Sequence, residues 1–290
     1  MTRIADLLAA GPTYSFEFFP PKNDKELATL ARTIGELQPL EPSFVSVTYR
    51  GGAESRQRTV DLVSGMLHTT NLNPMAHIIC VAHTRLELAD ILVSLRKAGV
   101  ENLMALGGDP PEDPDAGPGE LAYAAELVEL ARAIGGFSVG VAAHPAGHPR
   151  SSDLGSDRDF LAAKLALADF GVTQFFFEAS EYESLSADLR ERGVDTPVLP
   201  GILPVTSLST MGRLGAMGAA APDWMQDRLR AADARGGADA VRKEGVELAT
   251  ELCSKLLESG VPGLHFYTFN TSNATREIYA ALGLGPGTAS

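Results

Sequence analysis

The residue best placed for acid–base chemistry is Glu17, in the run SFEFFPP. Alternate side chains of a strand share a face, so Glu17 lies opposite the apolar side chains of Tyr14, Phe16 and Phe18. That apolar face is expected to pack against helices, which leaves Glu17 pointing into the interior of the fold. Burying an ionised carboxylate is costly unless it is paired, so burial favours the protonated form that a general acid needs. The alternative is a structural carboxylate paired with a buried base.

Two further polar residues follow apolar runs, Asp109 in ALGGDPP and Gln174 in TQFFF. Gly107 and Gly108 allow the backbone to approach a ligand closely, although Asp109 alone also fits an ordinary turn. Gln174 stands among bulky apolar side chains, and a buried amide must find hydrogen-bond partners. A substrate heteroatom and a backbone carbonyl are both possible partners, and the residues alone leave both open.

Thr48, His77, His144 and His148 fall at or just beyond the ends of expected strands. A lone histidine is more often a hydrogen-bonded structural residue than a catalyst. Together with His83 these histidines raise the question of a metal site, but no pair has the spacing of ligands on one helix. No carboxylate joins them in the sequence either, so the sequence predicts no metal.

Short apolar runs alternate with amphipathic segments and would position these residues. The expected strands are Tyr14–Phe19, Phe44–Thr48, Ala76–Val81, Leu103–Leu106, Ser138–Ala143, Val172–Phe177, Pro197–Pro200 and Leu264–Thr268. The expected helices are Asp24–Leu37, Glu54–Leu67, Leu86–Lys97, Glu120–Ile134, Asp157–Ala168, Glu181–Arg192, Ser207–Met217, a segment ending at Gly260, and one after Asn273.

This alternation favours a parallel sheet in an α/β fold. A chain of 290 residues suits a single (β/α)8 TIM barrel over 1–290, with a loop and helix insertion around 219–237. An open doubly wound sheet is the alternative, and the lack of a GxGxxG motif after the first strand disfavours it. The loops after the strands form the active face of such a barrel.

Composition excludes several classes of protein. The net charge of −13 repels phosphate backbones and argues against a nucleic-acid partner. Cys80 and Cys253 are expected to be reduced core thiols. The apolar stretch Leu7 to Ala10 is too short for a signal peptide, and no run approaches the length of a membrane span. We therefore expect a cytoplasmic protein with no membrane partner.

Eight segments together resemble methylenetetrahydrofolate reductases of the bacterial type. They occur in the family's order and span the chain: SFEFFPPK (15–22), FVSVTYRGG (44–52), LGGDPP (106–111), YAAELV (123–128), VAAHPAGHP (141–149), TQFFFE (173–178), LPGILPV (199–205) and HFYTFN (265–270). The family is a (β/α)8 barrel, in agreement with the strand count. The resemblance implies reduction of 5,10-methylenetetrahydrofolate to 5-methyltetrahydrofolate by a nicotinamide cofactor.

The resemblance also implies roles for individual residues. Glu17 matches the acid that protonates a ring nitrogen, which opens the five-membered ring to an iminium ion that accepts hydride. Asp109 matches the residue that contacts the pterin, and Gln174 the residue that contacts folate and nicotinamide in turn. Thr48 lies beside the hydride-transfer centre. Further substrate- and cofactor-binding positions are matched by His77, Gly108, Tyr123, Ala124, His144, His148, Asp157 and Lys164.

The chain departs from the family where the family binds FAD, the usual intermediate hydride carrier. Gly107 replaces an arginine, Phe160 an asparagine, Ala163 a second arginine, and His144 a tyrosine near the flavin ring. A hydrogen bond to a charged group contributes about 1.5–3 kcal/mol, so these losses would weaken flavin binding.

The sequence therefore predicts an oxidoreductase that transfers hydride from NADH or NADPH directly to the folate, without a flavin. NADH is the preferred coenzyme because the sequence shows no basic cluster that would bind the 2′-phosphate of NADPH. An ordinary FAD-dependent reductase is the alternative within the enzyme class. A folate-binding barrel without turnover is the alternative from another class. Folate and the nicotinamide nucleotide are the expected partners, and the sequence does not fix the oligomeric state.

Overall fold

A barrel of parallel strands forms the centre of the molecule in a computed structural model that describes residues 1–49, 53–109 and 117–285. The strands pair in the order β7-β6-β5-β4-β3-β2-β1-β9-β8. Their bounds are β1 Thr13–Phe18, β2 Phe44–Val47, β3 Pro74–Ile79, β4 Asn102–Leu106, β5 Ser138–Ala143, β6 Phe170–Thr173, β7 Val198–Leu199, β8 Gly201–Ile202 and β9 Gly263–Tyr267.

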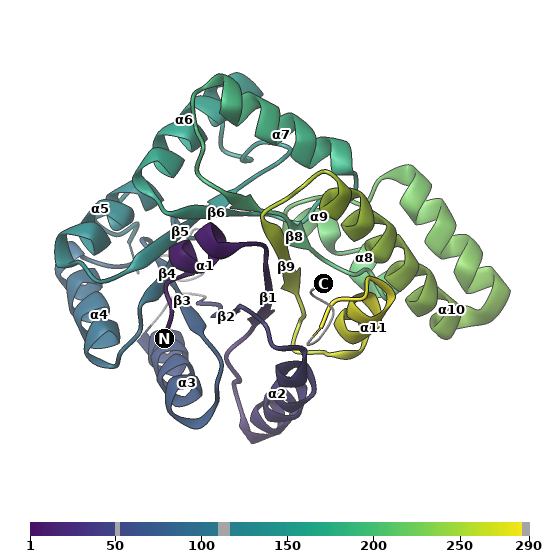
Figure 1. Ribbon diagram of the computed structural model, residues 1–290, viewed down its shortest axis with the longest axis horizontal. Coiled ribbons are helices and arrows are strands. Elements are labelled where there is room, and N and C mark those ends of the chain that lie inside the picture. The colour runs from purple at the N-terminus through teal and green to yellow at the C-terminus, as the bar shows by residue number, and fades with distance from the viewer. Residues whose placement is uncertain (50–52, 110–116, 286–290) are drawn as a thin grey trace.

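Two very short strands close the barrel. Only Pro200 separates β7 from β8, and β7 pairs with β6 whereas β8 pairs with β9. The two strands therefore occupy one strand position of the barrel. The nine strands fill the eight positions of a (β/α)8 barrel (Figure 1). The predicted fold class is confirmed.

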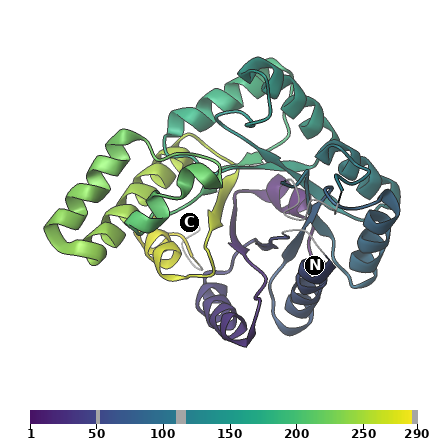
Figure 2. The same ribbon diagram turned by 180° about the vertical axis from the view of Figure 1, so that it is seen from behind.

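Helices surround the strands on the outside (Figures 1 and 2). They are α1 Ile4–Ala10, α2 Asp24–Leu37, the 3-10 helix η1 Gln38–Leu40, α3 Ala53–Thr69, α4 Arg85–Lys97, α5 Ala124–Ile134, α6 Leu154–Leu167, α7 Ala179–Glu191, α8 Leu208–Met211, α9 Leu214–Met217, α10 Asp223–Glu258 and α11 Asn273–Ala281. No helix in the described ranges is long and apolar enough to cross a membrane.

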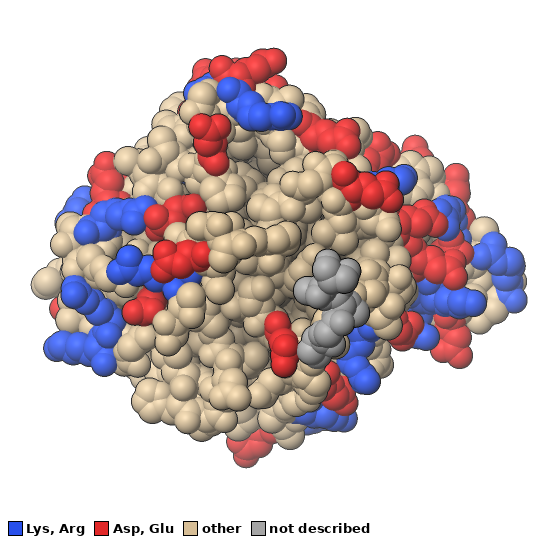
Figure 3. Space-filling view, viewed as in Figure 1, with Lys and Arg blue, Asp and Glu red and all other residues tan. Residues whose placement is uncertain are grey.

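Helix α1 closes the end of the barrel where the strands begin. The backbone N–H of Ile4 donates to Asn102, the first residue of β4, and that of Ala5 donates to Ser138, the first residue of β5. Helix α1 lies in front of the strands in Figure 1 and behind them in Figure 2, so Figure 2 faces the open mouth. On the closed face, charged side chains gather toward the rim and over α10 (Figure 3).

Strand alternation divides the interior as predicted. Phe16 and Phe18 are buried in the layer between the strands and the outer helices. Glu17, between them, is 8% exposed and faces other polar side chains inside the barrel. The apolar face therefore packs outward, and β1 presents its carboxylate to the lumen.

Two predicted elements differ clearly from the structure. The sixth strand is Phe170–Thr173 and ends before Gln174, so that residue lies in the following loop. The predicted helix Ser207–Met217 is two short helices that are interrupted around Gly212. In both cases the residue pattern continues past the point where the folded chain ends the element, and boundaries are the part that sequence patterns define least.

The segment around 219–237 forms the first arm of α10 and the turn that follows it. Gly236 and Gly237 leave helical geometry, and Gly237 has a φ of 61°, a conformation that glycine adopts at little cost. Arg228 on the first arm pairs with Glu244 on the second at 2.7 Å. The two arms therefore form a helical hairpin that extends beyond the barrel (Figure 1).

Candidate active site

Glu17 lies near the mouth end of β1, with three polar groups around one carboxyl oxygen. Its Oε2 is 3.6 Å from His77 Nε2, 3.7 Å from His265 Nε2 and 3.5 Å from Ser46 Oγ. These distances exceed those of strong hydrogen bonds. The carboxyl group is therefore surrounded by groups that can exchange protons with it, and no short bond holds it.

His265 connects Glu17 to a second side chain of β1. Its Nδ1 is hydrogen-bonded to Ser15 Oγ at 2.8 Å, and its Nε2 faces Glu17. The parallel register of β1 with β9 places Ser15 opposite His265 and Glu17 opposite Tyr267. Ser15, His265 and Glu17 therefore form a continuous polar chain inside the barrel, and the sequence prediction did not include its first two members.

Two buried polar atoms near Glu17 have no hydrogen-bond partner among the described residues. They are Nε2 of His77, within β3, and Oγ1 of Thr48, just past the end of β2. Burial lowers the pKa of His77, Glu17 opposes this shift, and His265 adds to it. Buried groups of this kind normally find a partner, so both atoms are available to a ligand.

Gln174 points toward the loop before α10 rather than toward Glu17. Its Nε2 donates to the carbonyl of Met217 at 3.1 Å, and its Oε1 accepts from the backbone N–H of Phe175 at 3.0 Å. A Cβ on Gly218 would lie 2.4 Å from Gln174 Nε2, so only glycine allows this contact. The backbone alternative is therefore observed, and one amide hydrogen remains for another acceptor.

Asp109 is exposed beyond the end of β4, next to residues that the structure does not describe. The preceding Gly108 has a φ of +87°, and a Cβ there would lie 2.5 Å from a methyl group of Val81. Glycine is therefore required at this turn. Parts of two predicted motifs, 50–52 and 110–111, lie outside the described residues.

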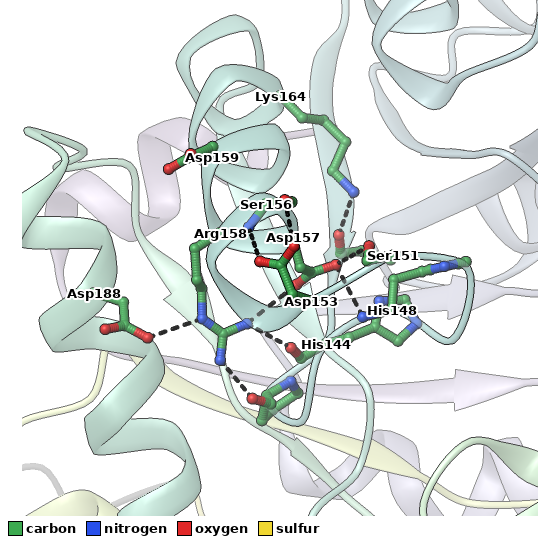
Figure 4. Close-up of polar contacts among 12 residues, drawn as sticks. His144, His148, Ser151, Asp153, Ser156, Asp157, Arg158, Asp159, Lys164 and Asp188 are labelled. Atoms are coloured by element: carbon green, nitrogen blue, oxygen red, sulfur yellow. Dashed lines mark hydrogen bonds and ion pairs between the residues drawn. The ribbon is translucent and has the colours of Figure 1, made fainter.

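The loop between β5 and α6 forms another wall of the mouth. Asp157 accepts hydrogen bonds from the backbone N–H of His148 at 2.9 Å and from Ser151 Oγ at 2.8 Å (Figure 4). The rings of His144 and His148 meet edge to face, with centroids 4.8 Å apart. The structure thus brings together His144, His148 and Asp157, three of the predicted binding residues.

A buried arginine, which the sequence prediction missed, fixes this loop. Arg158 donates to the carbonyls of His144 at 2.9 Å and Pro145 at 2.5 Å. It also pairs with Asp157 at 3.2 Å and with Asp188 of α7 at 3.0 Å (Figure 4). A charged residue on a helix usually faces solvent, so its position next to Asp157 in the sequence gave no signal of burial.

Lys164 extends from the last turn of α6 toward the same loop (Figure 4). Its Nζ donates to the carbonyl of Ala142 at 2.7 Å. Burial lowers the pKa of Lys164 to about 8, and Asp157 opposes this shift. The ammonium group retains hydrogens for an anionic ligand and is protonated at neutral pH.

The two histidines of the loop are neutral near pH 7. Burial lowers the pKa of His144 to about 4, and nearby His148 and Lys164 add to the shift. Burial also lowers the pKa of His148, as does Arg150, whereas Asp157 opposes the change. These rings can therefore accept or donate hydrogen bonds without carrying charge.

Sequence comparisons identify the family. A sequence model described as methylenetetrahydrofolate reductase matches residues 2–283. The chain belongs to the methylenetetrahydrofolate reductase family. The 5,10-methylenetetrahydrofolate reductase of Salmonella typhimurium is 34% identical over 275 residues, which are 94% of this chain and 91% of the relative. The Escherichia coli reductase of the same name has the same identity and coverage.

A solved structure from Clostridium thermocellum shares the fold of this reductase. It is described as an uncharacterized protein that binds two copies of 5-methyl-5,6,7,8-tetrahydrofolic acid. The two structures superpose with a TM-score of 0.70 over 96% of each chain, at 14% sequence identity. At this identity the likeness shows a common barrel architecture.

The family resemblance implies FAD contacts at Gly107, Phe160 and Ala163. Phe160 is 74% exposed on α6, and Ala163, also exposed, follows one turn later. Neither side chain offers a hydrogen-bond donor, and Gly107 has no side chain. These three positions do not fit the polar contacts that the family resemblance implies for FAD.

The remaining predicted positions lie around the start of α5. Tyr123 caps this helix and is 73% exposed, and Ala124 is its first residue. The described part of the chain contains no group of three or more histidine, cysteine, aspartate or glutamate side chains that could hold a metal ion.

Proposed function

We propose that this reductase converts 5,10-methylenetetrahydrofolate to 5-methyltetrahydrofolate by accepting hydride directly from a nicotinamide dinucleotide, NADH in preference to NADPH, in the cytoplasm. Membership of the reductase family supports the reaction class. The observation that carries the mechanism is a buried carboxyl group, Glu17, that lies inside the barrel beside two histidines.

Glu17 supplies the proton. Protonation of a nitrogen in the five-membered folate ring breaks its bond to the bridging methylene and leaves an iminium ion. The iminium carbon then accepts hydride, and the nicotinamide is oxidised by the two electrons that it gives up. The proton then returns to Glu17 from solvent through the open mouth of the barrel.

Thr48 and His77 support a ligand position next to Glu17, because their buried polar atoms lack partners in the described structure. Asp109 at the rim would steady the positive charge of the iminium ion. Gln174 would contact the reactants with its remaining amide hydrogen. These roles follow the residues that the family resemblance indicates.

The flavin-free route rests on the side chains at the family's flavin positions. Gly107, Phe160 and Ala163 provide no charged or polar contact for a diphosphate or ribityl chain. The retained Asp157, Lys164 and histidines of the β5–α6 loop are then available to the nicotinamide nucleotide. An FAD-dependent reductase remains the alternative that the experiment must separate.

Initial-rate kinetics on the purified protein test the proposal. We expect a colourless protein whose reciprocal plots intersect when NADH and methylenetetrahydrofolate are varied, as required for a ternary complex. A yellow protein with parallel plots would establish the FAD-dependent alternative. Folate binding without oxidation of NADH would establish a barrel without turnover. The ratio of kcat/KM for NADH and NADPH tests the coenzyme preference.

A further inference from the structure

An arginine from the β5–α6 loop occupies the space above Gly107. A Cβ built on Gly107 would lie 3.6 Å from Nη2 of Arg150, its one neighbour within 4 Å among the described residues outside its own chain neighbours. Gly107 directly follows β4, whereas Arg150 comes from the loop after β5. Two neighbouring strand ends therefore place a guanidinium group at the rim of the mouth, where the loops of a barrel bind their ligands.

The guanidinium of Arg150 has no carboxylate partner among the residues that the structure describes. It is exposed, and within the described ranges it makes no side-chain hydrogen bond or ion pair. Its charge reaches the mouth, because it lowers the pKa of His148. An unpaired cation on a chain with a net charge of −13 is a specific place for an anion to bind.

The loop that carries Arg150 is well anchored on both sides. The backbone N–H of Arg150 donates to His148 Nδ1 at 3.1 Å, and that of Ser151 donates to the carbonyl of His148 at 2.9 Å. Asp157 and Arg158 hold the preceding segment (Figure 4). A fixed backbone reduces the entropy lost when a side chain binds a ligand.

We propose that Arg150 is a coenzyme-binding residue that binds the diphosphate of the dinucleotide at the barrel mouth. This inference rests on the proposed function, in which that dinucleotide is NADH. Arginine suits a diphosphate because its planar group donates two parallel hydrogen bonds to phosphate oxygens. The glutamate tail of folate is the other anion among the reactants, and a flavin dinucleotide carries the same diphosphate.

The first test compares ligands that differ in the diphosphate. We expect Arg150→Gln to weaken NADH binding by about tenfold or more, with Arg150→Lys intermediate. Reduced nicotinamide mononucleotide lacks the diphosphate, so its KM should be the same in the variant and the parent. Arg230→Gln, which removes an exposed charge from α10, is the matched control and should leave the NADH affinity unchanged.

The second test moves the arginine to the other side of the same space. Gly107 has no left-handed φ and its Cβ position is open apart from Arg150, so an arginine fits there without backbone strain. The double variant Gly107→Arg/Arg150→Gln should recover part of the lost NADH affinity. Damage to the loop alone would not be repaired in this way.

Other outcomes overturn the inference. An unchanged NADH affinity in Arg150→Gln removes the residue from coenzyme binding, and a selective loss of polyglutamylated folate assigns it to the folate tail. Equal losses for NADH and the mononucleotide exclude a diphosphate contact. If the protein purifies with FAD, the proposed function fails, but weaker FAD retention in Arg150→Gln still supports the diphosphate contact and unchanged retention rejects it.

Discussion

At the scale of single residues, the environment of Glu17 explains how a carboxyl group can give away a proton. Three polar atoms lie 3.5–3.7 Å from its Oε2, which is longer than a strong hydrogen bond. His265 and Ser15 lie behind it and are hydrogen-bonded to each other. The proposed role of Glu17 as proton donor rests on this arrangement.

We predict that Glu17→Gln lowers kcat by about 10²- to 10⁴-fold, the usual contribution of a general acid. The amide has nearly the same shape, so the substrate and NADH should still bind, as isothermal titration would show. Glu17→Asp keeps an acidic group one methylene further back and should retain more activity. Turnover of Glu17→Gln near that of the parent would remove Glu17 from the mechanism.

The lowered pKa of Lys164 leads us to predict how coenzyme binding depends on pH. Its pKa is lowered from 10.5 to about 8 by burial, so its charge is lost as the pH rises through about 8. The KM for NADH should therefore increase above this pH. Lys164→Arg stays charged and should remove the increase, whereas Lys164→Gln should have a high KM throughout. A rise that persists in Lys164→Arg would contradict this assignment.

The same shift sets the sign of the stability change. Between about pH 8 and 10.5 the unfolded chain binds the Lys164 proton and the folded chain does not. The unfolding free energy contributed by this residue therefore rises with pH across that window and is lowest below it. The ammonium form at neutral pH thus costs stability, as is common for groups kept for ligand binding.

The sequence alone could predict Glu17 but not its partners. Strand alternation requires neighbouring residues only, and it placed Glu17 inside the barrel. The contact between Ser15 and His265 joins residues 250 positions apart and depends on the register of β1 with β9. No local pattern contains that register, so the polar chain became visible only in three dimensions.

At the scale of elements, Arg158 joins α6 to α7 and to the loop after β5. Its guanidinium satisfies two backbone carbonyls and two carboxylates in a nearly dry site. These contacts hold the backbone of His144 and the carboxylate of Asp157 in place. The wall of the mouth therefore depends on one buried cation.

We predict that Arg158→Met lowers the unfolding free energy by about 3–5 kcal/mol, because it leaves buried carboxylates unpaired. Arg192→Gln is the matched control. It breaks the Arg192–Asp159 pair, which also links α6 to α7 but at the surface, and should cost less than about 1 kcal/mol. Equal losses in urea unfolding would show that Arg158 has no special role.

Element boundaries were predictable where a cap or a turn marked them. Asn23 accepts from the N–H of Glu26 at the start of α2, and that helix was predicted with its correct bounds. The run from Val172 to Phe177 has no such marker. Strand β6 ends at Thr173 because the residues that follow it pack into the apolar clusters instead of pairing with a strand. Phe175 and Phe176, for example, belong to two different apolar clusters.

At the scale of the whole molecule, barrel closure creates the site. The short strands β7 and β8 together connect β6 to β9, and β9 then pairs with β1. Closure brings His77, His265 and Ser46 around Glu17 from three different strands. The strand count predicted this architecture, although it could not show that Pro200 separates two short strands at one strand position of the barrel.

The fate of the transferred hydrogen tests the flavin-free reaction most directly. NADH deuterated on the transferred face of the nicotinamide C4 should give 5-methyltetrahydrofolate whose methyl group carries one deuterium, as measured by mass spectrometry. A hydride carried on a flavin nitrogen exchanges with water before it is passed on. An unlabelled methyl group formed in H2O from the same deuterated NADH would therefore contradict direct transfer.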